Sequence, residues 1–166
     1  MCLLALVTIA PAPAAVRAGH RPGHRSEVSE QTVRHPAPIP LAAATLEQCD
    51  TAAQKSERSV TLAGEMSAIP DTAHMAIRIE LQERLPEEAA FHTVRAPALG
   101  MWRESEPAVK AFKYLNKVAN LSAPAVYRAA VRFRWLNAKG RPIKQLERHT
   151  AACVQPALAP KPTSSS

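Results

Sequence analysis

Apolar and polar residues alternate with a period of two through much of the middle of the chain. The cleanest run begins at His74 and continues to Gln82, with apolar side chains at every second position. This is the spacing of a β-strand that buries one face and exposes the other. We therefore predict a strand that starts at His74 and ends near Leu85, before Pro86. Its inward positions are Met75, Ile77, Ile79 and Leu81.

Shorter runs predict further strands on both sides of this one. The chain alternates from Val60 to Met66 and then breaks at Pro70. The other predicted strands lie near Phe91, near Trp102, over 111–121, over 125–136 and roughly from Ile143 to Ala152. About seven short strands at intervals of about ten residues, with no alternating helices, are typical of an antiparallel β-sandwich. The predicted fold class is therefore all-β.

The stretch "AVYRAAVRFRWLNAKGRPI", from Ala125 to Ile143, mixes arginines with aromatic residues. Alternation assigns the two kinds of residue to opposite faces of one strand. The inward face takes Tyr127, Ala129, Val131, Phe133 and Trp135. The outward face takes Arg128, Ala130, Arg132 and Arg134. Gly140 then supplies the positive φ that a tight turn needs before the return strand.

The segment that leads into this strand resembles the corner between strands E and F of fibronectin type III and related immunoglobulin-like domains. The matching residues are Leu121, Pro124 and Tyr127. In that family the tyrosine hydroxyl bonds to nearby backbone and holds the corner. The stretch from Cys49 to Cys153 also resembles extracytoplasmic bacterial domains that join such sandwiches to adhesion modules. The resemblance implies a fibronectin type III-like or immunoglobulin-like β-sandwich in a secreted bacterial protein, and it implies no enzymatic activity.

The prolines divide the chain into a folded middle and two extended ends. The chain has 166 residues with 15 prolines and only 5 glycines, and the prolines crowd towards the two ends. An apolar run from Cys2 to Ala10, followed by small residues, is typical of a secretory signal and is too short to span a bilayer. We predict a signal-like segment at 1–18, a proline-rich linker at 19–45, a β-sandwich domain at 46–156 and a disordered tail at 157–166.

Removal of the signal-like segment leaves two cysteines, Cys49 and Cys153, which bracket the predicted domain. In an oxidising compartment, an even pair at the two ends of a small domain favours a disulfide. Two inert thiols are the alternative, and no accompanying spacing of histidines or cysteines supports a metal site. We therefore expect a disulfide, a secreted or extracytoplasmic location and no metal.

The net charge of +7 is unevenly distributed. Residues 49–106 contain 6 basic and 10 acidic residues, whereas residues 107–148 contain 10 basic residues and one acidic residue. Such a concentration of charge can attract polyanions, and it also keeps an exported domain soluble. Two successive predicted strands could form an anion-binding face from Lys110, Lys113, Lys117, Arg128, Arg132 and Arg134. Nucleic acid is disfavoured, because the aromatic residues of the arginine strand point the other way.

No familiar catalytic or cofactor-binding motif occurs in the sequence. His74, His92 and His149 lie within the predicted domain, but their spacing selects no serine as a nucleophile. The first expectation is an exported, non-catalytic module for adhesion, scaffolding or protein binding at the cell envelope, with no cofactor. The alternative is a cationic module that binds glycan, polyphosphate or nucleic acid, and a small secreted hydrolase is the third hypothesis. The expected partner is a protein or a cell-surface polymer.

Overall fold

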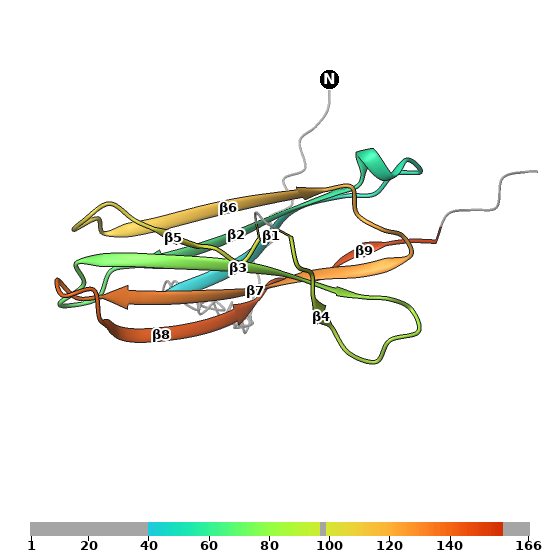
Figure 1. Cartoon of the computed structure of the whole chain (residues 1–166). Helices are drawn as coiled ribbons and strands as arrows, with labels where there is room; N and C mark the ends of the chain where they lie inside the picture. The colour runs from blue at the N-terminus through green and yellow to red at the C-terminus, as the bar shows by residue number, and fades with distance from the viewer. Residues whose placement is uncertain (1–39, 97–98, 158–166) are drawn as a thin grey trace, which may run out of the picture. The chain divides into compact units, whose positions relative to one another are not determined.

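The computed structural model describes residues 40–96 and 99–157, which form two antiparallel β-sheets packed face to face (Figure 1). The predicted signal-like segment, most of the predicted linker and the tail beyond residue 157 lie outside the described residues. The all-β antiparallel sandwich that the alternation predicts is confirmed.

Within the described ranges, the smaller sheet has three strands in the order β1-β2-β6, namely β1 (Ala42–Asp50), β2 (Ser59–Ser67) and β6 (Ala111–Ala119). The larger sheet is built on the pair β3 (His74–Arg84) and β7 (Ala125–Leu136). One edge of β3 is covered by β4 (His92–Thr93) and β5 (Trp102–Glu104). One edge of β7 is covered by β8 (Pro142–His149) and β9 (Cys153–Gln155). A short 3-10 helix, η1 (Lys55–Glu57), connects β1 to β2.

The core lies between the sheets and contains the positions that the alternation assigns inward. The predicted inward residues of β3 are all buried, and Phe133 and Trp135 of β7 have no exposed surface. The indole nitrogen of Trp135 donates to the Ser67 carbonyl oxygen at 2.7 Å, which satisfies its polar group inside the core. Tight packing extends to Gly64 of β2, where a Cβ would lie 2.8 Å from a methyl carbon of Ile77 and from one of Val131.

Two boundaries differ from those predicted. β1 begins at Ala42, so the domain starts before residue 46 and includes the end of the predicted linker. Three consecutive alanines give no contrast between large apolar and polar side chains, and the alternation therefore does not reveal this edge strand. The last predicted strand, roughly Ile143 to Ala152, ends at His149 in the structure, and a further strand that was not predicted, β9, begins at Cys153. Between them, the Thr150 hydroxyl oxygen accepts a hydrogen bond from the Ala129 amide at 2.9 Å.

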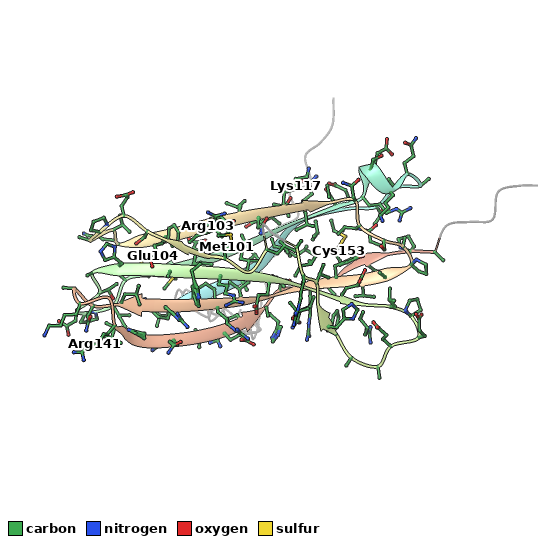
Figure 2. The ribbon with its side chains drawn as sticks, viewed as in Figure 1. Met101, Arg103, Glu104, Lys117, Arg141 and Cys153 are labelled. Carbon is green, nitrogen blue, oxygen red and sulfur yellow. A yellow bond between two sulfur atoms is a disulfide. The ribbon has the colours of Figure 1, made fainter. Side chains whose placement is uncertain are left out.

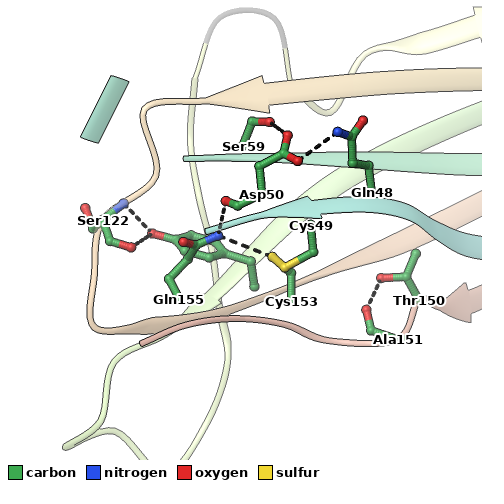
Figure 3. The surroundings of a disulfide bond; sticks show 10 residues. Gln48, Cys49, Asp50, Ser59, Ser122, Thr150, Ala151, Cys153 and Gln155 are labelled. Atoms are coloured by element: carbon green, nitrogen blue, oxygen red, sulfur yellow. Dashed lines mark hydrogen bonds between the residues drawn. A yellow bond between two sulfur atoms is a disulfide. The ribbon is translucent and has the colours of Figure 1, made fainter. Parts of the chain in front are cut away.

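A disulfide joins Cys49 of β1 to Cys153 of β9, with Cα atoms 5.5 Å apart (Figure 3). The predicted pairing is confirmed, and it connects the two sheets as well as the two ends of the domain. Hydrogen bonds strengthen the same region, since Gln155 Nε2 donates to the Asp50 carbonyl oxygen at 3.0 Å and Ser59 Oγ donates to the Asp50 carboxylate. The bond from Ser59 is the main cause that lowers the pKa of the Asp50 carboxyl.

We expect Gly64→Ala to destabilise the domain by about 1–3 kcal/mol, because the added methyl group would overlap two core side chains. Urea unfolding followed by tryptophan fluorescence measures the change in the free energy of unfolding. Lys139→Ala, at an exposed turn, is the control and should change that free energy by less than about 0.5 kcal/mol. An unchanged midpoint for Gly64→Ala would show that the two sheets do not need to approach closely there.

Replacing both cysteines, as Cys49→Ala with Cys153→Ala, should lower the free energy of unfolding by about 2–5 kcal/mol. The reason is that the bond closes a loop with a sequence separation of 104 residues. Adding a reductant to the wild-type protein should produce a similar loss, whereas the double variant should not respond to reductant. A double variant as stable as the oxidised wild type would contradict the expectation.

Candidate functional site

The outer face of the larger sheet carries the arginines that the sequence assigns outward. We call this surface the arginine face and define it by Arg78, Glu80 and Gln82 of β3, Arg128, Arg132 and Arg134 of β7, and Gln145 and Glu147 of β8. The strand register sets these residues opposite one another in rows across the sheet. Such cross-strand neighbours interact directly through their side chains.

The centre of the arginine face is electrostatically balanced. Arg132 Nε donates to Glu147 Oε2 at 2.7 Å, and Arg132 Nη1 lies 3.5 Å from Glu80 Oε2. Arg78 donates to the other oxygen of Glu80. The hydrogen bond to Glu147 and the charge of Glu80 raise the pKa of the Arg132 guanidinium above its ordinary value. Two carboxylates therefore neutralise the two central arginines.

The two ends of the arginine face differ from its centre, because an uncharged glutamine replaces the carboxylate. Arg128 Nε donates to Gln82 Oε1 at 2.8 Å, and Arg134 Nε donates to Gln145 Oε1 at 3.2 Å. Each of these guanidiniums also stacks on an aromatic ring. Arg128 lies 4.0 Å from the centroid of Phe91, and Arg134 lies 4.1 Å from that of Trp102. Stacking of this kind favours the cation without neutralising its charge.

Lys110, Lys113 and Lys117 do not belong to this surface, contrary to the sequence-based prediction of one cationic face. Lys113 and Lys117 lie on β6, which pairs with β2 in the smaller sheet, and Lys110 immediately precedes β6 (Figure 2 shows Lys117). The prediction is wrong because it assumed that successive strands pair, whereas the chain crosses to the other sheet between β6 and β7. Lys113 instead contacts Glu47 of β1 at 3.0 Å, which lowers the pKa of Glu47.

Phe91 and Trp102 place aromatic rings on the arginine face, a feature that the sequence reasoning missed. The inward placement of Tyr127, Phe133 and Trp135 agrees with the prediction, since all three are buried. Trp102 lies in a strand of three residues, and Phe91 immediately precedes a strand of two residues. Segments this short have too few positions for a period of two to assign a face.

Two hollows open on the arginine face and share Arg132. The larger, of about 630 Å³, is lined by Arg78, Glu80, Thr93, Val94, Leu99 and Arg132, among others. The smaller, of about 280 Å³, lies beside it and is lined by Trp102, Arg132, Arg134, Gln145 and Glu147, among others. The surface thus offers cationic, amide and apolar groups in adjoining depressions.

The corner between β6 and β7 is held by Tyr127, whose side chain is buried. Its hydroxyl oxygen accepts a hydrogen bond from the Ser122 amide at 3.0 Å and donates to the Glu83 carboxylate (Figure 3 shows Ser122). Burial, followed by the bond to Glu83, raises the pKa of Tyr127 to about 12. Leu121 is buried at the same corner, whereas Pro124 is exposed and follows a cis peptide bond.

Arg58, which lies between η1 and β2, also supports this corner, and nothing in the sequence pattern indicates it. Its side chain is buried, and its guanidinium donates to the carbonyl oxygens of Ala52, Ala53 and Leu121 at 2.9–3.1 Å. The arginine therefore ties the loop containing η1 to the start of the corner.

The candidate histidines occupy separate positions. His74 Nδ1 lies 3.4 Å from the Ser105 carbonyl oxygen, while the Ser105 hydroxyl accepts from the Met75 amide and donates to the Glu106 carbonyl oxygen. His149 lies 3.9 Å from the carboxylate of Glu147. His74 thus contacts the backbone of this serine and not its hydroxyl.

His92 lies between two carboxylates. It is 3.3 Å from Glu83 and 3.1 Å from Glu88. Glu88 also accepts a hydrogen bond from the Leu85 amide.

Residues 40–96 and 99–157 contain no cluster of three or more His, Cys, Asp or Glu side chains that could hold a metal ion. In the same ranges, no helix is long and apolar enough to cross a membrane.

Neither a protein-family model nor a curated protein matches this chain.

Raising the pH should destabilise the protein through Tyr127. Its pKa is about 12 in the folded state and about 10 in an unfolded chain. The protonated Tyr127 hydroxyl therefore contributes on the order of 2 kcal/mol to the free energy of unfolding. This contribution is fully present below about pH 10 and is lost as the pH rises towards about 12. Urea unfolding of the wild type and of Tyr127→Phe between about pH 9 and pH 12 measures the difference. If the free energy of unfolding changed equally with pH in the two proteins, Tyr127 would not contribute to the pH dependence of stability.

Proposed function

We propose that this protein is an exported, non-catalytic binding module with a fibronectin type III-like fold, and that it acts in adhesion, scaffolding or protein binding at a bacterial cell envelope. The observation that carries the proposal is the Cys49–Cys153 disulfide. Disulfides form and persist mainly in oxidising compartments outside the cytosol. The apolar run from Cys2 to Ala10, which is typical of a secretory signal, supports the same location.

The order of the strands supports the choice of fold family. Strands β1, β2 and β6 share one sheet, and β3, β7 and β8 share the other. This order corresponds to strands A, B and E facing strands C, F and G of immunoglobulin-like sandwiches. On this assignment β6 and β7 are strands E and F, and Tyr127 occupies the position of the corner tyrosine. The fold itself carries no activity, so a binding role needs additional support from the exposed surface.

The arginine face supports a binding role. Its side chains are held by hydrogen bonds and stacking on a rigid sheet. A surface whose side chains are already ordered loses less conformational entropy when a partner binds.

Export and oxidation are tested together by expressing the full chain in a bacterium and fractionating the cells. We expect the protein in the periplasm or medium, with cysteines that react with a thiol reagent only after denaturation and reduction. Cys49→Ser with Cys153→Ser provides the unreactive control for these two positions. Protein retained in the cytosol, with both thiols reactive without reduction, would overturn the proposed function.

A further inference from the structure

The guanidiniums at the two ends of the arginine face are fixed but not neutralised. Stacking on Phe91 or Trp102 occupies the flat face of each group, and a glutamine occupies its Nε. Among the described residues, no carboxylate forms a salt bridge with Arg128 or Arg134. The terminal Nη groups of both arginines thus remain as donors for an external oxyanion, in a geometry that is already ordered.

The strand register shows where the positive charge is kept. In the middle row Arg132 stands opposite Glu147, whereas in the adjacent row Arg134 stands opposite Gln145. Further along the strand Arg128 stands opposite Gln82. Glutamine has almost the shape of glutamate but no charge. The same kind of contact therefore orders the arginine in each row but neutralises it only in the middle one.

From this arrangement we propose that the arginine face binds an acidic polysaccharide, with its carboxylate or sulfate groups on Arg128 and Arg134. This inference rests on the proposed binding role at the cell envelope. Planar guanidiniums pair with carboxylates through two parallel hydrogen bonds. The larger hollow, which Arg132 lines, offers the apolar side chains of Val94 and Leu99 beside polar groups, which suits the mixed surface of a sugar ring.

The separation of the two arginines requires an extended ligand. They lie six residues apart on β7, which corresponds to about 20 Å along a strand. A single small anion cannot reach both groups, whereas a polymer with repeating acidic groups can. The two hollows that share Arg132 offer such a chain adjoining depressions on this face, and Arg134 itself lines the smaller one.

The aromatic rings favour a polymer without bases. Proteins that bind single-stranded nucleic acid leave aromatic ring faces open for bases to stack on. Here Arg134 covers Trp102, and Phe91 lies under both Arg128, at 4.0 Å, and Arg84, at 5.2 Å. Guanidiniums thus already stack on both rings, which order the cations and leave less ring surface open to bases.

The test adds the missing carboxylates without removing any arginine. In Gln82→Glu with Gln145→Glu, each new carboxylate would pair with the arginine that the glutamine already contacts, so the fold should be retained. Heparin serves as the sulfated probe and polygalacturonate as the carboxylated probe, both at physiological salt. We expect the variant to bind each glycan at least about tenfold more weakly than the wild type, because both free cations become neutralised.

Lys113→Gln with Lys117→Gln is the matched control, since it changes the net charge by the same amount on the other sheet. This control should bind the glycans nearly as well as the wild type. An equal loss in both variants would mean that net charge alone is responsible, and it would overturn the proposal. Unchanged binding by the glutamate variant would overturn it as well.

Competition with single-stranded DNA and with polyphosphate, compared at equal charge concentration, distinguishes the class of polymer. We expect both competitors to displace the glycan less effectively than free glycan does. Tighter binding of DNA would overturn the assignment to a polysaccharide. If the wild type binds no glycan yet is exported and oxidised, this inference fails while the proposed function stands. If the protein is cytosolic and reduced but the purified chain binds glycan, the proposed function fails and the assignment of the arginine face to a polysaccharide stands.

Discussion

Burial of the inward side chains of β7 is the constraint on which the rest of the structure depends. Val131, Phe133 and Trp135 fill the space between the sheets, and β7 is paired along both of its edges. Because side chains alternate strictly along a strand, a slip of one residue would expose these groups and bury the arginines. The packing of the core thereby also fixes the outward direction of Arg128, Arg132 and Arg134.

The turn between β7 and β8 then determines which residues of β8 lie opposite Arg132 and Arg134. Asn137 accepts hydrogen bonds from the amides of Lys139 and Arg141 through its side-chain oxygen, and Gly140 adopts a φ of 71°. A turn of fixed length sets the register of the hairpin that it closes. A shift of two residues in that register would place either Glu147 opposite Arg134 or Gln145 opposite Arg132, and it would thereby move the neutralised position along the face.

Alternation along the sequence is sufficient to predict the long strands and their buried faces, because it reflects burial on one side of a sheet. The disulfide is also predictable from the sequence, because the two cysteines form an even pair that brackets the alternating region. Sheet membership is different: nothing local to β6 indicates that it pairs with β2 and not with β7. The alanine-rich β1, the ring of Trp102 and the buried Arg58 also depend on contacts between residues far apart in the chain, which a single sequence does not display.

The position of the disulfide has a mechanical consequence. A pulling force applied to the two flanks of the domain would load the part of β1 before Cys49 and the part of β9 after Cys153, and at the two cysteines it would pass through a covalent bond. Without that bond, the 104-residue separation could extend by about 340 Å before the chain became taut. The sandwich between the cysteines is therefore shielded from tension, and the module would behave as a nearly inextensible segment of whatever chain it belongs to.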